Sequence, residues 1–207
     1  MKDFAYAYMT IGWRSSWHQV RREIQRRNKQ TAEPIVEGDF VSAKEHFLME
    51  SPLGTLTLVN TEGILSGLYL PDHKHGPKSE SLGARTRLGF EQTVSELQEY
   101  FDRKRTLFTL PLAPTGTSFQ QSIWRLLRDI PYGETRTYAQ LADAIGNRAA
   151  IRAVGLANGR NPISIVVPCH RVIGSDGGLT GYAGGLNRKR FLLDLEGAAQ
   201  SRQLELI

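Results

Sequence analysis

Apolar and polar residues alternate along three short stretches in the first half of the chain. These stretches are residues 46–50, 54–60 and 64–70, and residues that favour turns separate them. A period of two places apolar side chains on one face of a β-strand. Because short turns join neighbouring antiparallel strands, the pattern predicts a three-stranded meander. A polar, mobile loop is expected after it, over residues 71–83.

Beyond residue 88 the apolar spacing becomes that of helices, in which every third or fourth side chain shares a face. Residues 88–101 and 118–130 have this spacing. Residues 118–121 and 137–140 have the pattern of capping boxes, in which a hydroxyl and a Gln side chain bind the first amides of a helix. The sequence therefore predicts that helices begin at both places.

Two of the predicted helices are joined by a short glycine turn, which is the shape of a helix-turn-helix. The first begins at Thr137, Gly146 suits its left-handed C-terminal position, and Asn147 suits the N-cap of the second. The second helix, residues 148–158, carries small side chains on its outer surface, from which Arg152 projects. A flat ligand can approach such a surface closely, although an alanine-rich packing helix has the same pattern.

Three further segments complete the second half of the chain. The β-branched residues 165–167 predict a short buried strand that ends at Pro168, which has no amide proton to give to a sheet. Residues 177–185 form a glycine-rich loop that lacks the spacing and the Lys of a phosphate-binding loop. Residues 188–196 predict a last helix, which Gly197 ends.

The first part of the chain has a different character. Trp13, Trp17, Val20 and Ile24 recur at helical spacing, and arginines surround them. Such a basic amphipathic helix either lies on a membrane or a partner, or packs on its own domain with the arginines in water, and we favour packing. The sequence thus divides into an N-terminal extension, an α+β domain, a mostly helical domain and a tail, at residues 1–42, 43–115, 116–200 and 201–207.

Positive charge is concentrated in the second half of the chain. The net charge is +5 and the isoelectric point is about 9.5. Residues 119–197 hold ten Lys and Arg against six Asp and Glu, whereas residues 51–118 hold seven of each. This excess suits a polyanionic partner. We find no membrane span and no signal peptide, so we expect no membrane partner and a cytoplasmic location, or a nuclear one in a eukaryote.

Cys169 is the only cysteine in the chain. A single cysteine cannot form an intramolecular disulfide or a Cys-rich zinc site, which leaves an inert buried thiol or a nucleophile. The imidazole of His170 and the guanidinium of Arg171 follow it directly, and such neighbours favour the reactive thiolate. His73 and His75 have no third ligand nearby, so the sequence predicts no metal site.

The sequence resembles the O6-alkylguanine-DNA alkyltransferases at three motifs: Asn-Pro at 161–162, Pro-Cys-His-Arg at 168–171 and Tyr-x-Gly-Gly at 182–185. Residues 119–197 resemble the family's active-site domain, and residues 45–115 its smaller N-terminal domain. The resemblance implies an α+β fold: a ribonuclease-H-like domain, then a mostly helical, winged-helix-like domain with a helix-turn-helix. It also implies DNA repair by direct reversal, in which O6-alkylguanine in double-stranded DNA, with O4-alkylthymine as a further candidate, loses its alkyl group irreversibly to a cysteine without a cofactor.

The resemblance assigns catalytic roles residue by residue. Cys169 resembles the alkyl acceptor, and His170 resembles its proton acceptor, which acts through a water molecule. Glu196 resembles the carboxylate that orients the imidazole, as in other sets of nucleophile, base and orienting group. Asn161 resembles the hinge between the recognition helix and the active-site segment, and Tyr182 the phenol that hydrogen-bonds the purine.

Other positions resemble the family's base pocket and DNA-binding surface. The Val172 carbonyl resembles the acceptor for the guanine amino group, and Ala183 stands where many relatives carry Ser, with its backbone amide still available. Arg152 resembles the finger that fills the base stack once the nucleotide is flipped out, and Tyr138 the residue that rotates the phosphate. The small residues that admit the helix to the minor groove are Ala153, Gly155 and Ala157. We expect a monomer and leave clustering on DNA open.

Three other interpretations stay open at this point. An alkyltransferase-like protein senses lesions without transfer, but such proteins replace the acceptor cysteine that this chain keeps. A DNA-binding regulator with an inert thiol leaves His170 and Glu196 without a purpose. A Cys–His hydrolase needs an oxyanion hole, which no pattern in the sequence indicates.

Overall fold

The first described segment of the chain is a four-stranded sheet. The computed structural model describes residues 44–198, in which β1 (Lys44–Met49), β2 (Leu56–Thr61) and β3 (Ile64–Tyr69) pair antiparallel, so the predicted meander is confirmed. A fourth strand, β4 (Ala84–Arg85), pairs parallel with β1 and gives the order β3-β2-β1-β4. The sequence did not indicate β4, because two residues are too short to show alternation.

The segment between β3 and β4 has more structure than the predicted mobile loop. It contains a 3₁₀ turn at Ser79–Ser81 and then reaches β4 through Gly83. Gly83 has a φ of 76°, and a Cβ there would lie 1.9 Å from the carbonyl oxygen of Lys44. Only glycine therefore lets the chain come close enough to pair with β1.

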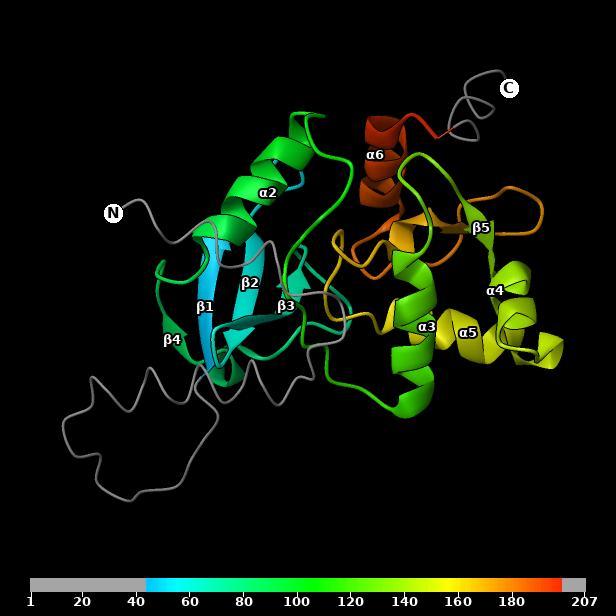
Figure 1. Cartoon of the computed structure of the whole chain (residues 1–207), viewed down its shortest axis with the longest axis horizontal. Coiled ribbons are helices and arrows are strands. Elements are labelled where there is room, and N and C mark those ends of the chain that lie inside the picture. Colours follow the sequence, from blue (N-terminus) through cyan, green and yellow to red (C-terminus); the bar gives the residue numbers. More distant parts are fainter. Residues whose placement is uncertain (1–43, 199–207) are drawn as a thin grey trace, which may run out of the picture. The chain divides into compact units, whose positions relative to one another are not determined.

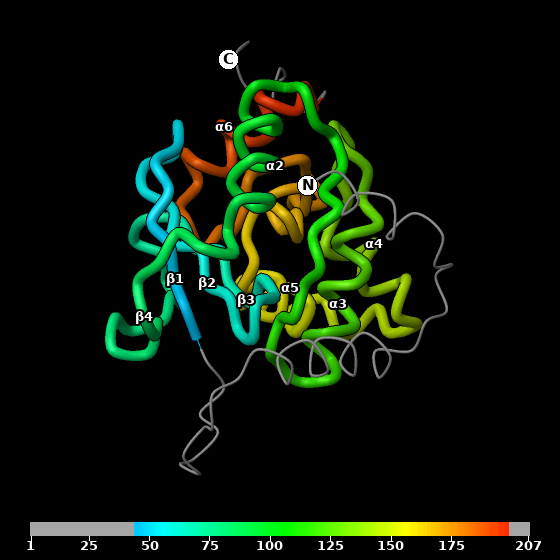
Figure 2. The backbone as a smooth tube through the Cα atoms, turned by 60° about the vertical axis from the view of Figure 1, so that its left-hand side comes forward, coloured from blue at the N-terminus to red at the C-terminus, as the bar shows by residue number. Residues whose placement is uncertain are grey.

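Helix α2 (Glu91–Phe101) lies beside the sheet (Figures 1 and 2). Its inner face buries Leu97 and Tyr100 completely. The sequence predicted a start at residue 88, but the helix begins at Glu91. The reason is that Gly89 has a left-handed φ of 83°, which an α-helix cannot contain. The side chain of Tyr100 points toward the second half of the protein, where its hydroxyl reaches Glu196.

The second half is built from helices with a short two-stranded sheet (Figure 1). Helices α3 and α4 both pack against α5, and α4 with α5 forms the predicted helix-turn-helix. The helices are α3 (Ser118–Arg128), α4 (Tyr138–Ala144), α5 (Ile151–Gly159) and α6 (Leu186–Glu196). The parallel strands are β5 (Arg136–Thr137) and β6 (Val172–Ile173).

Two helix starts have capping boxes. The box at Thr137 is confirmed, since its hydroxyl accepts from the amide of Gln140 and the Gln140 side chain accepts from the amide of Thr137. For α3 the predicted box was wrong by one residue, because Thr117 rather than Ser118 is the N-cap and pairs with Gln120. Adjacent hydroxyls and adjacent glutamines make both registers equally plausible in the sequence.

The recognition helix also differs from its prediction. Residues Arg148–Ala150 form a 3₁₀ turn, and the α-helix starts only at Ile151 and continues through Gly159. The side chain of Asn147 forms no cap bond. Gly146 does adopt the predicted left-handed conformation, with a φ of 71°, and so does Gly197 after α6, with a φ of 69°.

The predicted strand at residues 165–167 was wrong. Ile165 has a φ of 70°, and the amide of Val167 donates to the carbonyl of Ile163, so the segment is a tight turn. The residues just before it pair with β3 instead: the amide of Leu68 donates to the carbonyl of Pro162 at 2.8 Å, and the amide of Ser164 to that of Leu68 at 3.0 Å. The β-branched side chains favoured a strand in the sequence, but the pairing of the preceding residues with β3 forces residues 165–167 into a turn.

One hydrophobic core runs through both halves of the described chain. It joins Leu68 and Tyr100 of the first half to Ile163 and Val167 of the second, all of them buried. Within residues 44–198 no helix is long and apolar enough to cross a membrane. The predicted helix around residues 13–24 lies outside the described residues.

Candidate active site

Cys169 begins a 3₁₀ turn, Cys169–Arg171, that leads directly into β6. This corrects the expectation that the thiol stands at the end of a strand. The residue is 3% exposed. Burial raises the pKa of the Cys169 thiol, while the nearby Asn161 side chain and the Lys189 charge act in the opposite direction. The thiol therefore rests protonated in the free protein and needs a base to become a nucleophile.

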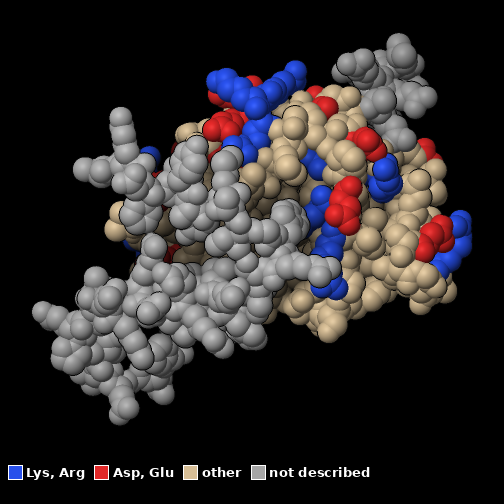
Figure 3. Space-filling view, viewed as in Figure 1, with Lys and Arg blue, Asp and Glu red and all other residues tan. Residues whose placement is uncertain are grey.

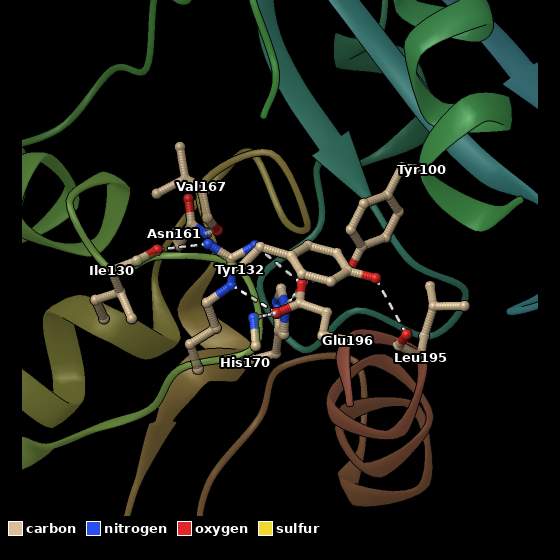
Figure 4. A network of polar contacts seen from close by, with 10 residues as sticks. Tyr100, Ile130, Tyr132, Asn161, Val167, His170, Leu195 and Glu196 are labelled. Atoms are coloured by element: carbon tan, nitrogen blue, oxygen red, sulfur yellow. Dashed lines mark hydrogen bonds and ion pairs between the residues drawn. The ribbon is translucent and has the colours of Figure 1, made fainter. Parts of the chain in front are cut away.

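His170 is fully buried, and its Nε2 lies 2.9 Å from Oε1 of Glu196 (Figure 4). Burial lowers the pKa of the His170 ring below its usual value, although Glu196 acts against this, so the ring is neutral at pH 7. A carboxylate only accepts hydrogen bonds, so we assign the single ring proton to Nε2. Nδ1 then carries a free lone pair, and this buried atom has no hydrogen-bond partner among residues 44–198.

Glu196 is the most heavily bonded side chain of the site. Arg171 donates to both of its oxygens, at 2.8 and 2.9 Å, the Tyr100 hydroxyl donates at 2.7 Å, and the Gly133 amide at 3.2 Å. Burial alone would raise the pKa of the carboxyl, but His170 and Arg171 hold it well below its usual range. The carboxylate is therefore ionised and fixed in place, which in turn fixes the His170 ring.

Two tyrosines surround this ion pair (Figure 4). Tyr100 comes from α2 of the first half, so the sheet domain supplies a direct donor to the carboxylate. Tyr132 donates to the carbonyl of Leu195 at 3.1 Å, and the Arg171 guanidinium lies 5.9 Å from its ring centroid. A low-dielectric setting of this kind strengthens each hydrogen bond to the charged groups.

Asn161 holds the turn that delivers Cys169. Its Nδ2 donates to the Val167 carbonyl at 2.7 Å (Figure 4), and its Oδ1 accepts from the Ile163 amide at 3.0 Å. These bonds close the loop between the end of α5 and Pro168. The structure thus places Asn161 where the resemblance expects a hinge, between the recognition helix and the cysteine.

The glycine-rich loop brings Tyr182 and Ala183 to the same place. The Tyr182 hydroxyl is buried with Ser164 near it, yet no described side chain meets it with hydrogen-bond geometry. Burial raises its pKa well above the usual value, so the phenol keeps its proton and can donate it to a ligand. Val172 is fully buried, and its carbonyl already accepts from the ammonium of Lys189, which leaves it one lone pair for a purine amino group.

A hollow of about 770 Å³ opens next to these residues. Its lining includes Tyr138, Arg152, Gly155, Tyr182 and Ala183, so the structure brings together most of the predicted pocket and DNA-binding residues. The Tyr138 hydroxyl donates to the carbonyls of residues 180 and 181 at 3.3 and 3.4 Å, which ties α4 to the glycine-rich loop. Ala153 is exposed on α5 near the hollow but is not part of its lining.

Ala157 requires a correction. It is 2% exposed and lies on the inner face of α5 with Val154 and Asn158. Its carbonyl accepts from the indole of Trp124 in α3 at 2.9 Å. Because it is buried with Val154 and Asn158, this alanine packs α5 against α3 and is not on the exposed surface of the helix.

Three buried residues of the site were not among the predicted ones. Arg171 follows the cysteine directly and its adjacency was a usable signal, whereas Tyr100 is separated from Glu196 by 96 positions and carried none. Lys189 stands between two arginines at positions 188 and 190, yet it is fully buried and donates to the carbonyls of Val172 and Thr180. Burial lowers its pKa to about 8. No group of three His, Cys, Asp or Glu that suits a metal ion occurs within residues 44–198.

Comparison with protein-family models finds two matches. Residues 46–114 match the ribonuclease-like domain of 6-O-methylguanine DNA methyltransferase, and residues 118–198 match its DNA binding domain. The two segments follow each other without overlap and cover most of the described chain. They support the predicted α+β fold with its helical second domain.

Curated relatives of this chain are methylated-DNA–protein-cysteine methyltransferases. The methylated-DNA–protein-cysteine methyltransferase of Methanosarcina barkeri is 51% identical over 152 residues, which are 72% of this chain and 94% of the relative. That of Mycobacterium tuberculosis H37Rv is 48% identical over 158 residues, 76% of this chain and 95% of the relative. The crystal structure of M. tuberculosis OGT in complex with DNA is 46% identical, with a TM-score of 0.70 over 75% of this chain and 96% of that one.

Proposed function

The chain belongs to the O6-alkylguanine-DNA alkyltransferases, the methylated-DNA–protein-cysteine methyltransferases, and we propose that Cys169 is the residue that takes the alkyl group from damaged guanine. The protein acts in DNA repair by alkyl transfer. One observation carries the assignment of the acceptor: the only thiol of the chain is buried, and the residue that follows it in sequence is a neutral imidazole whose tautomer Glu196 fixes.

The proposed step needs one proton acceptor and one donor. His170 takes the proton of the Cys169 thiol at Nδ1, through a water molecule, and Glu196 stabilises the resulting imidazolium. The thiolate sulfur then attacks the alkyl carbon, an S–C bond forms, and the bond from carbon to O6 breaks with its electron pair on guanine. The unpartnered Tyr182 hydroxyl donates to the purine as this negative charge develops.

The transfer is irreversible in this proposal. The product is a thioether, which contains no good leaving group, and the chain has no second thiol to receive the alkyl group. Each molecule therefore reacts once. No metal or cofactor takes part in the proposed step.

The DNA-binding residues suggest how the buried base reaches the thiol. A base inside a duplex must be flipped out, at a cost of a few kcal/mol, and the vacated space must be filled. Arg152 is exposed on α5 at the rim of the hollow and is long enough to enter a base stack. Ala153 and Gly155 beside it leave the helix surface low, which suits the minor groove, and we assign rotation of the target phosphate to Tyr138.

We predict that Arg152→Ala slows transfer from duplex DNA by about tenfold or more, because the flipped state loses the group that occupies its place. Reaction with free O6-benzylguanine, which needs no flipping, stays within about twofold of the unmodified protein. Both rates are read as loss of active protein over time. The matched control is Arg148→Ala, which removes an exposed arginine one turn earlier that pairs with Asp143 and does not line the hollow. Equal losses on duplex and free base would contradict the assignment.

Two alternatives stay distinguishable from this proposal. A lesion-sensing protein would bind alkylated duplex without any covalent change. A regulator would prefer one DNA sequence strongly, whereas the proposed repair protein binds mainly through phosphates, with an affinity that falls steeply with salt and varies little with sequence.

A further inference from the structure

The hollow beside the active site has a wall that comes from the first half of the chain. Lys74 and His75, from the segment between β3 and β4, line it together with Arg152 and Arg160 of the recognition-helix side. We propose that Lys74, with His75 beside it, binds the phosphate backbone of the lesion-bearing strand as the flipped nucleotide enters. This inference rests on the proposed function, since it takes the hollow as the entry for DNA.

The segment that carries Lys74 is held firmly against the active-site loop. The amide of Lys74 donates to the carbonyl of Ala183 at 3.0 Å. Arg188 of α6 donates to the carbonyl of Pro71 at 3.0 Å and to that of Gly184 at 2.9 Å. Lys74 is thus bonded directly to the loop that carries Tyr182, and this bond fixes the position of its backbone relative to that loop.

His73 fixes the same segment from inside. Its ring stands edge-on to Tyr69 at 5.4 Å, its Nδ1 accepts from the amide of His75 at 3.3 Å, and its Nε2 faces the Ser164 hydroxyl at 3.4 Å. Burial, and then the neighbouring His75, lower the pKa of His73 to about 4, so the ring is neutral at pH 7 and donates from Nε2 to Ser164. With His73 turned inward, the side chains of Lys74 and His75 remain exposed toward the hollow.

The charge of the hollow selects the partner. Every charged side chain in its described lining is basic, and none is acidic. The face drawn in Figure 3 differs, because Lys and Arg there lie next to Asp and Glu. No described carboxylate lies within ion-pair distance of Lys74. Basic groups on both walls suit a phosphate chain that passes between them, and an exposed ammonium gains nothing from an apolar alkyl group.

The test is the salt dependence of DNA binding by the full chain. Lys74→Ala should reduce the slope of log K against log salt by about 0.9, the value for one phosphate contact on B-DNA, and weaken binding to an unmodified duplex at low salt. Lys74→Arg should keep the slope. The matched control is Lys78→Ala, which removes an exposed lysine of the same segment that does not line the hollow and should leave the slope unchanged.

A second readout separates this surface from the reaction. Lys74→Ala should slow transfer from duplex DNA at moderate salt while its rate with free O6-benzylguanine stays at the wild-type value. An unchanged salt slope in Lys74→Ala would overturn the phosphate contact. An equal loss of rate with duplex DNA and with free O6-benzylguanine would also overturn it, because Lys74 would then act on the base or its alkyl group. If the wild-type protein bound duplex but transferred nothing, the proposed function would fail while the slope of Lys74→Ala would still decide this contact.

Discussion

Cys169→Ala abolishes alkyl transfer and leaves binding to duplex DNA that contains O6-methylguanine intact. The chain has one thiol, so no other side chain can supply a thiolate in its place. The substitution removes a single sulfur atom from a buried site, which we expect to cost no more than about 1 kcal/mol of stability. Transfer is measured with an oligonucleotide labelled in its methyl group, and binding by fluorescence anisotropy on the same duplex.

Cys169→Ser is the matched control for this experiment. Serine restores a polar atom at the site of the sulfur, but an alcohol stays protonated beside a neutral imidazole and reacts far more slowly than a thiolate. We therefore expect binding and no detectable transfer from this variant as well. Label on the protein after incubation with either variant would show that another residue accepts the alkyl group.

Glu196→Gln should slow alkyl transfer by about 10²- to 10⁴-fold, the usual contribution of a positioned general base. Without the carboxylate, His170 loses the partner that fixes its Nε2 proton and stabilises its charged form. The same change leaves the guanidinium of Arg171 buried without its counterion, which typically costs about 3–5 kcal/mol. Single-turnover rates and thermal unfolding of the same preparations measure the two effects.

The pH dependence of unfolding isolates the role of this carboxylate. Its pKa is depressed in the folded protein, so between that value and the ordinary value of 4.5 the unfolded chain binds more protons. The stabilisation by Glu196 is therefore complete above pH 4.5 and is lost as the pH falls below it. Glu196→Gln should flatten this acid loss, whereas Glu134→Gln, at an exposed ion pair with Arg136, should not.

Tyr100→Phe tests the same network if Glu196→Gln does not fold. It removes one donor to the carboxylate and keeps its charge, its bond to His170 and its pair with Arg171. A smaller slowing than for Glu196→Gln is expected, with the protein still folded. If Glu196→Gln unfolded while Tyr100→Phe transferred the alkyl group at the wild-type rate, the network would serve stability alone.

Local patterns were sufficient for much of the fold. The alternation in residues 46–70 predicted the meander, and the Thr137 box with Gly146 predicted the helix-turn-helix, because each depends on residues close in the chain. The segment at residues 165–167 was mispredicted for the opposite reason: the residues just before it, Pro162 and Ser164, pair with Leu68, almost a hundred residues away in sequence. β4 escaped notice because its partner strand, not its own pattern, makes it a strand.

The candidate site divides in the same way. The motif around Cys169 drew attention to His170 and Arg171, and resemblance to the family pointed to Glu196. Nothing local indicated that Tyr100 of α2 donates to that carboxylate, or that Lys189 is buried in a run of basic residues. The first follows from how the two halves pack and the second from how α6 packs on residues 172 and 180, and a single sequence displays neither.

The most direct test of the account is intact-mass spectrometry of the wild-type protein after incubation with excess duplex oligonucleotide that contains O6-methylguanine. The account predicts one added methyl group per molecule, no further gain with longer incubation, and peptide mapping that places the methyl on Cys169. An unchanged mass with binding retained, or a methyl group on another residue, would contradict it.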